Sequence, residues 1–214
     1  MTKTGIEQIR QGTDLEEIDY SYVIDCLKEY GSPRAKITRL LKVGDLIRVK
    51  KGLYVFGKRY RRRMYSLEIL ANKIYGPSYI SLEYALSYYG MIPEYVVEVT
   101  SMTYKRKRAY VTPVGRFSYT PLPSNLYTIG FTLVPLTNDS SALIATPEKA
   151  LADLLYIRKP EIQTVSELKE LLFEDLRLDE SKILSLNIQM LKSIKNQGGS
   201  PLLPLLITYL RSQK

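Results

Sequence analysis

Apolar residues in the first third of the chain recur with the spacing of α-helices and then give way to two strand-like runs. Residues 3–11 and 20–30 predict two short helices, since apolar side chains recur there at helical spacing. Ser32 and Pro33 supply an N-cap and a first-turn proline for a third helix, which we expect to run to about Val43 and to stop at Gly44.

A hairpin is predicted directly after this third helix. The runs Leu46–Val49 and Leu53–Phe56 are rich in β-branched and aromatic residues, and a Lys50-Lys51-Gly52 turn separates them. Three helices followed by a hairpin within about 55 residues is the element order of a winged helix-turn-helix. We therefore expect residues 1–63 to form a winged helix-turn-helix DNA-binding domain.

The third helix has two chemically different faces. Ile37, Leu40 and Leu41 lie on one narrow apolar side when the helix is projected at 3.6 residues per turn. The opposite side is small, hydroxylic and cationic, and consists of Ala35, Thr38, Arg39 and Lys42. Arginine can bind the edge of guanine, threonine and alanine can touch a thymine methyl group, and lysine can bind a phosphate. This face is typical of a recognition helix, whereas an ordinary surface helix would more often include acidic residues.

Residues 64–214 predict a second domain of mixed α+β type with a helical C-terminal third. Helices are expected over 66–75 and 81–89, followed by strands over 95–102, 109–112, 117–120 and 131–135. Thr146-Pro147-Glu148 is a helix start that leads to Tyr156. Further helices are expected over 164–175, 180–195 and 202–212, so the chain as a whole is assigned to the α+β class.

Positive charge is concentrated in one window of the chain. The net charge is +9, yet residues 31–63 alone hold twelve Lys and Arg against one acid, while residues 1–30 hold three against seven. Such focusing creates a local positive potential that attracts polyanions. A solvated basic face is the plainer alternative, but a single acid leaves almost no intramolecular pairing, so nucleic-acid binding is favoured.

Composition argues against several other classes of protein. The chain has no histidine, which is the commonest general base and metal ligand, and Cys26 is its single cysteine. We find no phosphate loop, paired-carboxylate motif or nucleophile elbow, so no enzyme, metal site or cofactor is predicted. The apolar run Pro201–Leu210 is too short to span a bilayer, and no signal peptide is recognised. A cytoplasmic protein without a membrane partner is expected.

The remaining cations fall into two groups. The predicted wing and the basic run after it could bind phosphates through Arg48, Lys50, Lys51, Lys58, Arg59, Arg61, Arg62 and Arg63, although such a run can also be a solvated linker. A second basic cluster, Lys105, Arg106, Lys107 and Arg108, is flanked by Tyr104 and Tyr110. Aromatic residues beside cations occur where proteins bind RNA or single strands, and a solvated hairpin turn is the alternative.

Three segments carry a resemblance to a known family. They are Leu40–Phe56, Pro77-Ser78-Tyr79-Ile80-Ser81 through to Gly90, and Ala145-Thr146-Pro147-Glu148-Lys149-Ala150-Leu151-Ala152-Asp153-Leu154-Leu155-Tyr156. In order and spacing they resemble the AbiEi-type antitoxins of the type IV AbiE abortive-infection systems. Tyr89 stands where that family often has a histidine, and residues before 20 and the last 55 match nothing in it. The resemblance implies a bacterial protein that represses its own operon and neutralises a nucleotidyltransferase-like toxin.

Two hypotheses follow from the sequence. The first is a DNA-binding transcriptional regulator, an AbiEi-like antitoxin that binds inverted repeats upstream of its own gene. The second is a protein- or RNA-interaction module, whose larger domain binds the partner while the basic window only assists.

Overall fold

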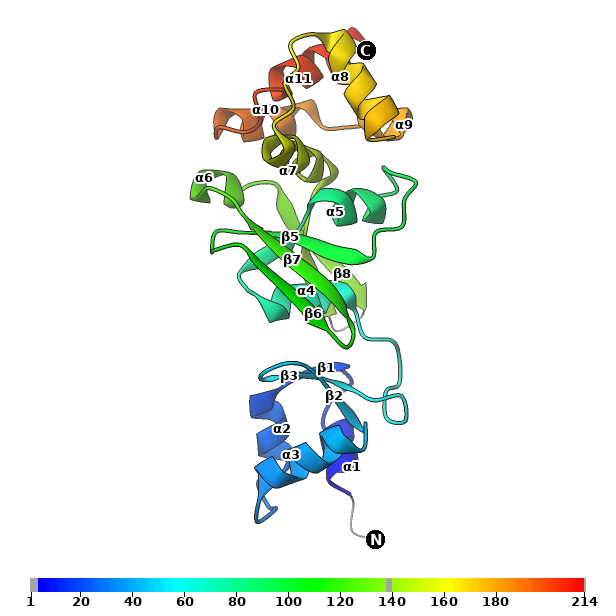
Figure 1. Cartoon of the computed structure of the whole chain (residues 1–214), viewed down its shortest axis with the longest axis vertical. Coiled ribbons are helices and arrows are strands. Elements are labelled where there is room, and N and C mark those ends of the chain that lie inside the picture. Colours follow the sequence, from blue (N-terminus) through cyan, green and yellow to red (C-terminus); the bar gives the residue numbers. More distant parts are fainter. Residues whose placement is uncertain (1–3, 138–139, 214) are drawn as a thin grey trace.

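The computed structural model describes residues 4–137 and 140–213, and these fold as a mixed α+β protein with two sheets and a helical C-terminal region (Figure 1). The first elements in the chain are α1 (Gly5–Gln11), β1 (Glu17–Asp19), α2 (Tyr20–Cys26), α3 (Pro33–Lys42), β2 (Leu46–Lys50) and β3 (Leu53–Phe56). The three helices and the hairpin lie where the sequence predicts them, although α2 is shorter than expected. Within the described ranges, no helix is long and apolar enough to cross a membrane.

A short strand that the sequence did not predict, β1, completes the first sheet. The strand order is β1-β3-β2, with both pairings antiparallel. One face of this sheet packs against α1, α2 and α3 through Ile18, Leu46, Tyr54 and Phe56. On the other face, Val49, Leu53 and Val55 belong to the core of the rest of the molecule. The sheet thus lies between the first three helices and the larger part of the chain (Figure 1).

The ends of α3 are set by backbone geometry. Pro33 occupies the first turn, and Gly44 adopts a φ of 77° just after the helix. The chain then returns so closely that the Gly57 backbone N–H donates to the carbonyl oxygen of Asp45 at 2.9 Å. A Cβ atom on Gly57 would lie 1.8 Å from the carbonyl oxygen of Gly44. Glycine at 57 is therefore required for the hairpin to close against the end of α3.

The larger sheet has six strands in the order β6-β7-β5-β4-β9-β8. In chain order these are β4 (Ser78–Ile80), β5 (Glu98–Thr103), β6 (Arg108–Thr112), β7 (Gly115–Pro121), β8 (Phe131–Thr137) and β9 (Ser140–Ala145). The helices packed with it are α4 (Leu67–Ile74), α5 (Leu82–Tyr88), α6 (Ser124–Tyr127) and α7 (Pro147–Arg158). Helix α7 is buried along residues 148–155, because α5 and α10 pack against it as well.

The C-terminal helices form a separate layer beyond α7, at the opposite end of the molecule from α3 (Figure 1). They are α8 (Val165–Glu170), which continues as a π-helix over Leu171–Asp175, then α9 (Glu180–Leu184), α10 (Ile188–Asn196) and α11 (Leu203–Ser212). The predicted helix over 180–195 is wrong in one respect, since it is two helices. Asn187 caps the second one by accepting hydrogen bonds from Gln189 N and Met190 N.

Other departures from the predicted elements are additions or shifts. Strands β4 and β9 and the short helix α6 were not predicted, and β5 starts at Glu98 rather than at Tyr95. Strand β4 has only three residues, so alternation could not reveal it. It is defined by its partners, since it pairs antiparallel with β5 and parallel with β9.

Candidate nucleic-acid interface

The outward face of α3 is exposed as the helical projection predicts. Ala35, Thr38, Arg39 and Lys42 are exposed, whereas Ile37 and Leu40 are buried. The hydroxyl of Thr38 donates to the carbonyl oxygen of Arg34 at 3.1 Å, so its methyl group is the part free to touch a ligand. Within the described residues, neither Arg39 nor Lys42 lies in an ion pair with a carboxylate. This face therefore offers two uncompensated cations.

A groove at the N-terminal end of α3 collects further cations. Its lining residues, here called the tyrosine groove, are Tyr20, Arg34, Arg48, Lys51, Gly52 and Tyr54. The Nε of Arg34 donates to the hydroxyl of Tyr20 at 3.2 Å, and the guanidinium of Arg48 lies 6.0 Å from the centre of the Tyr54 ring. None of the lining residues is acidic. Three cations and two tyrosines thus converge on one hollow that a phosphate group or a sugar edge could enter.

Of the six groove residues, the sequence predicted Arg48 and Lys51 as site residues but not Tyr20, Arg34, Gly52 or Tyr54. Arg34 lies at the start of α3 and outside the face opposite Ile37 from which the projection predicts base contacts. Its position in the first turn of a basic helix was the available signal. Tyr20 gave no signal, since only the fold brings the first residue of α2 beside the turn between β2 and β3, where its N–H donates to the carbonyl oxygen of Gly52 at 2.9 Å.

A second groove lies along the C-terminal half of α3. It is lined by Thr38, Leu41, Lys42, Gly44, Leu46, Ile47, Arg48 and Pro113, and is called the Pro113 groove here. Pro113 belongs to the turn between β6 and β7, so the larger part of the chain forms one wall. Arg48 lines both grooves and therefore lies centrally on this surface.

The two lysines of the predicted wing have different environments. Lys51 is exposed, whereas Lys50 Nζ donates to the carbonyl oxygen of Ile74 at the end of α4. Burial lowers the pKa of Lys50, and the positive charge of Lys105 lowers it further. A helix C-terminus favours a nearby cation, because its last carbonyl groups lack partners within the helix. Lys50 thus joins the two parts of the chain, and Lys51 is the lysine of this turn that remains available to a ligand.

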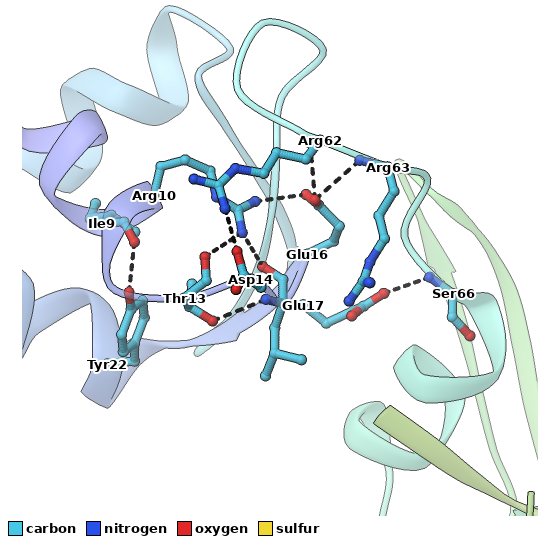
Figure 2. Close-up of polar contacts among 11 residues, drawn as sticks. Ile9, Arg10, Thr13, Asp14, Glu16, Glu17, Tyr22, Arg62, Arg63 and Ser66 are labelled. Carbon is cyan, nitrogen blue, oxygen red and sulfur yellow. Dashed lines mark hydrogen bonds and ion pairs between the residues drawn. The ribbon is translucent and has the colours of Figure 1, made fainter. Parts of the chain in front are cut away.

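The basic run after the hairpin is fixed by acidic residues of the N-terminal segment (Figure 2). Glu16 Oε1 accepts hydrogen bonds from the backbone N–H groups of Arg62 at 3.0 Å and Arg63 at 3.3 Å. Its other oxygen accepts from Arg10 Nη1 at 3.1 Å, in an ion pair that is almost fully buried. The guanidinium of Arg62 pairs with Asp14. The excess of acids in residues 1–30 thus serves partly to hold this linker in place.

Other cations of the run differ in exposure. Lys58, Arg59 and Arg63 are exposed, and Arg61 is half-buried. The guanidinium of Arg59 lies 5.4 Å from the centre of the Tyr60 ring. Lys58, Arg59 and Arg63 are therefore the members of the run that a phosphate could reach most easily.

Glu17, the neighbour of Glu16, anchors the start of α4. Its Oε1 accepts from the backbone N–H of Ser66 at 2.5 Å, and its carbonyl oxygen accepts from Lys73 Nζ at 3.1 Å. The side chain is buried, and this burial raises the pKa of the Glu17 carboxyl above its ordinary value. Ser66 in turn caps α4, since its hydroxyl accepts from Ile69 N at 3.1 Å.

The second basic cluster lies at the turn between β5 and β6. Lys105, Arg106, Lys107 and Arg108 are all exposed. Lys105 Nζ donates to the carbonyl oxygen of Gly76 at 2.6 Å, close to the Ile74 carbonyl that binds Lys50. The flanking tyrosines pack on neighbouring rings, with Tyr104 edge-on to Tyr127 at 5.3 Å and Tyr110 at 5.9 Å from Tyr119. Their rings are thus partly engaged within the protein.

Two of the three segments that carry the family resemblance, the second and the third, meet in a buried polar network. Asp153 Oδ1 accepts from Lys149 Nζ at 2.6 Å, and Oδ2 accepts from Ser81 Oγ at 2.7 Å and from Tyr79 OH at 3.0 Å. Lys149 and Asp153 lie on α7, while Tyr79 and Ser81 flank Ile80 at the end of β4. Thr146 caps α7 by accepting from Lys149 N at 3.3 Å, as the sequence predicts. All four side chains are inaccessible, so this network fixes α7 on the sheet rather than binding a ligand.

Comparisons with known proteins inform the fold alone. No family model matches the chain, and no curated protein matches it. The crystal structure of the RV2827C protein from Mycobacterium tuberculosis is similar over 96% of this chain and 82% of that chain, with a TM-score of 0.51 and 14% sequence identity. At this identity the likeness extends to the α+β arrangement with its helical C-terminal region, and to nothing more specific.

Proposed function

We propose that the chain is a DNA-binding transcriptional regulator and that residues 1–63 act as a winged helix-turn-helix. The observation that carries the proposal is the exposed outer face of α3 with the tyrosine groove beside it. Several cations lie together there, and no acid among the described residues pairs with them. Helix α3 enters the major groove of duplex DNA, and the β2–β3 turn contacts the adjacent backbone.

The residues divide into base-reading and phosphate-binding groups. Arg39, with Ala35 and the methyl group of Thr38, contacts base edges from the outer face of α3. Lys42, Arg34, Arg48 and Lys51 bind phosphates along the two grooves, and exposed Lys58, Arg59 and Arg63 extend the contact. Lys50 is left out of this set because its ammonium group binds the carbonyl oxygen of Ile74.

Replacing Arg39 tests base recognition. Arg39→Ala is expected to weaken binding to the operator by about 1–3 kcal/mol and to reduce discrimination between sequences, since the side chain reads a base. Fluorescence anisotropy with the DNA upstream of the gene measures both quantities. Lys195→Ala is the matched control, because it removes an exposed positive charge from α10 at the other end of the molecule. Equal operator binding by an Arg39→Ala, Lys42→Ala double variant would exclude α3 as the recognition helix.

Replacing Lys51 tests the phosphate-binding role of the wing. Lys51→Ala is expected to weaken specific and non-specific DNA alike and to reduce the slope of log affinity against log salt by about one unit, because one phosphate contact is lost. A salt titration of affinity for operator and random DNA measures the slope. A loss confined to the operator would show instead that Lys51 reads sequence.

The resemblance to AbiEi-type antitoxins adds a biological setting to this proposal. We propose that the protein binds inverted repeats upstream of its own operon and counteracts a nucleotidyltransferase-like toxin encoded beside it. Co-expression with the neighbouring gene tests the second part, with growth as the readout. If Arg39→Ala, Lys42→Ala protein still restores growth, neutralisation and DNA binding are separate activities of one chain.

A second candidate function is a protein-interaction module, and one observation favours it. Tyr95 is 85% exposed and Val97 67% exposed, beside a hollow lined by Tyr84, Ser87, Tyr88, Tyr95 and Val96. Exposed aromatic residues around a hollow are typical of protein-binding surfaces. Tyr95→Ala separates the two candidates, because it should leave DNA affinity unchanged and abolish neutralisation if this surface binds the partner.

A further inference from the structure

One edge of the six-stranded sheet lacks the charged residues that usually keep sheet edges apart. Strand β8 is the last strand on its side and pairs only with β9 among the described strands. Asp139 is the one charged residue between Arg116 and Glu148 in the sequence, and Leu133 on β8 is 62% exposed. Natural sheets usually protect an edge with lysines, prolines, bulges or a covering element. Strand β8 has Pro135 and a shift of register between Pro135 and Thr137 near its C-terminal end, and its pairing with β9 is regular from Phe131 to Pro135.

The register shows which backbone groups of β8 point outward. The backbone N–H of Thr146 donates to the carbonyl oxygen of Gly130 at 2.8 Å, and the same register continues with Thr132 opposite Ile144 and Val134 opposite Ala142. Hydrogen-bonded and non-bonded pairs alternate along antiparallel strands. The backbone groups of Phe131, Leu133 and Pro135 therefore point away from β9. Proline has no backbone N–H, but at position 135 this group would point away from β9, so no hydrogen bond to β9 is lost.

We infer that β8 pairs with β8 of a second copy of this chain, about a two-fold axis at Leu133. In this arrangement each Leu133 N–H donates to the Leu133 carbonyl oxygen of the other copy. Each Phe131 N–H donates to the other copy's Pro135 carbonyl oxygen, whereas the Phe131 carbonyl oxygen lies opposite the proline nitrogen and gains no donor. Apart from this carbonyl group, the outward groups of β8 are their own complement, as an isologous contact requires.

Two further observations favour a second copy at this edge. The opposite edge strand, β6, begins at Arg108 and follows the exposed cations Lys105, Arg106 and Lys107, which would repel a second copy. Strand β8 contains no charged side chain that could repel β8 of a second copy. Pairing would also bury the two Leu133 side chains against each other at the axis. The inference does not depend on DNA binding, although a two-fold dimer suits an inverted-repeat operator.

The oligomeric state of the full chain tests the inference. Sedimentation velocity over a concentration series should show a dimer for the natural protein and a monomer for Leu133→Lys, which places two like charges directly opposite each other. Leu133→Pro should also be monomeric, since it removes the two central donors and, like Pro135, leaves the β9 ladder intact. Val111→Lys is the matched control, because Val111 is 84% exposed on the other edge strand and should leave the dimer unchanged.

Cysteine cross-linking checks the register. In a Cys26→Ser background, Leu133→Cys should form an intermolecular disulfide with a mild oxidant, because the paired Cα atoms lie about 5.5 Å apart in a hydrogen-bonded antiparallel pair. Thr132→Cys should not, since it lies opposite Val134 of the other copy. A natural protein that stays monomeric throughout the series, or a dimer that survives Leu133→Lys or dissociates with Val111→Lys, would overturn the inference.

Discussion

Neighbouring residues with the same charge have different roles in this protein, and the backbone groups near them decide which. Lys50 and Lys51 are adjacent, yet Lys50 binds a carbonyl oxygen at the end of α4 while Lys51 lines the tyrosine groove. Glu16 and Glu17 are adjacent as well, and each carboxylate accepts backbone N–H groups from a different part of the linker. The sequence predicted a cationic wing, but it could not distinguish the lysine that joins the two parts from the one that is free.

The buried carboxylate of Glu17 predicts an unusual dependence of stability on pH. Its pKa is raised in the folded state, so between the unfolded and folded pKa values the folded protein binds more protons, and stability rises as the pH falls. Glu17→Gln keeps an acceptor for the Ser66 N–H and removes the charge. The free energy of unfolding of the variant, relative to that of the natural protein, should therefore be highest at neutral pH and should decrease as the pH falls. Urea unfolding at several pH values measures this difference.

A control with the opposite sign is available in Glu167. Hydrogen bonds from the backbone N–H groups of Gln163 and Thr164 lower the pKa of this exposed carboxyl. The natural protein should exceed Glu167→Gln in stability at neutral pH and lose this advantage as the pH falls. The same trend in both variants would contradict the assignment for Glu17.

Among the secondary-structure elements, those with a strong local pattern were predicted and those defined by partners were not. Helix α3 and the hairpin follow from apolar spacing, Pro33 and the two glycines at 44 and 52, which have φ angles of 77° and 87°. Strands β1 and β4 have three residues each, which is too short for a pattern to emerge. Residue Leu82 shows the same limit, since it has a φ of 59° at the start of α5 although leucine disfavours that region.

Closure of the hairpin against α3 predicts a large effect of one methyl group. Gly57→Ala would place a Cβ atom 1.8 Å from the Gly44 carbonyl oxygen, so the hairpin must move away from the end of α3. We expect the free energy of unfolding to decrease by about 1 kcal/mol or more. DNA binding should also weaken, since Arg48 and Lys51 would move relative to α3. Thermal unfolding and anisotropy measure the two effects.

Gly31→Ala is the matched control for this substitution. Gly31 lies just before the N-terminus of α3, whereas Gly57 packs near the C-terminus of that helix. A Cβ atom added at Gly31 meets nothing within 4 Å. This variant should unfold within about 0.5 kcal/mol of the natural protein. If both alanine variants were equally stable, the close approach at Gly57 would not be needed for the fold.

In the whole molecule, the three-stranded sheet contributes to both hydrophobic cores. Leu53-Tyr54-Val55-Phe56 is buried throughout, with alternate side chains facing the first three helices and the larger part of the chain. The boundary at residue 63, predicted from the change in charge, therefore has an apolar contact across it. Glu17 and Lys50 add polar contacts between the same two parts, to Ser66 N and to the carbonyl oxygen of Ile74.

This shared sheet predicts that the chain unfolds as one unit. Scanning calorimetry should give a single transition with equal calorimetric and van't Hoff enthalpies, because separating residues 1–63 would expose Val49, Leu53 and Val55 to water. Val55→Ser, at the centre of the contact, should broaden or split the transition. Two resolved transitions in the natural protein would show that the parts are independent.

Local sequence patterns are enough to predict the α+β class, the amphipathic third helix, the hairpin and the concentration of positive charge, because each depends on residues close together in the chain. Long-range packing, in contrast, sets which cations remain free, which partners the acids of residues 1–30 bind and which residues line the tyrosine groove. The physical reason is the same in each case. The carbonyl oxygen of Ile74, the N–H of Ser66 and the ring of Tyr20 reach their partners through long-range packing, which no local pattern records.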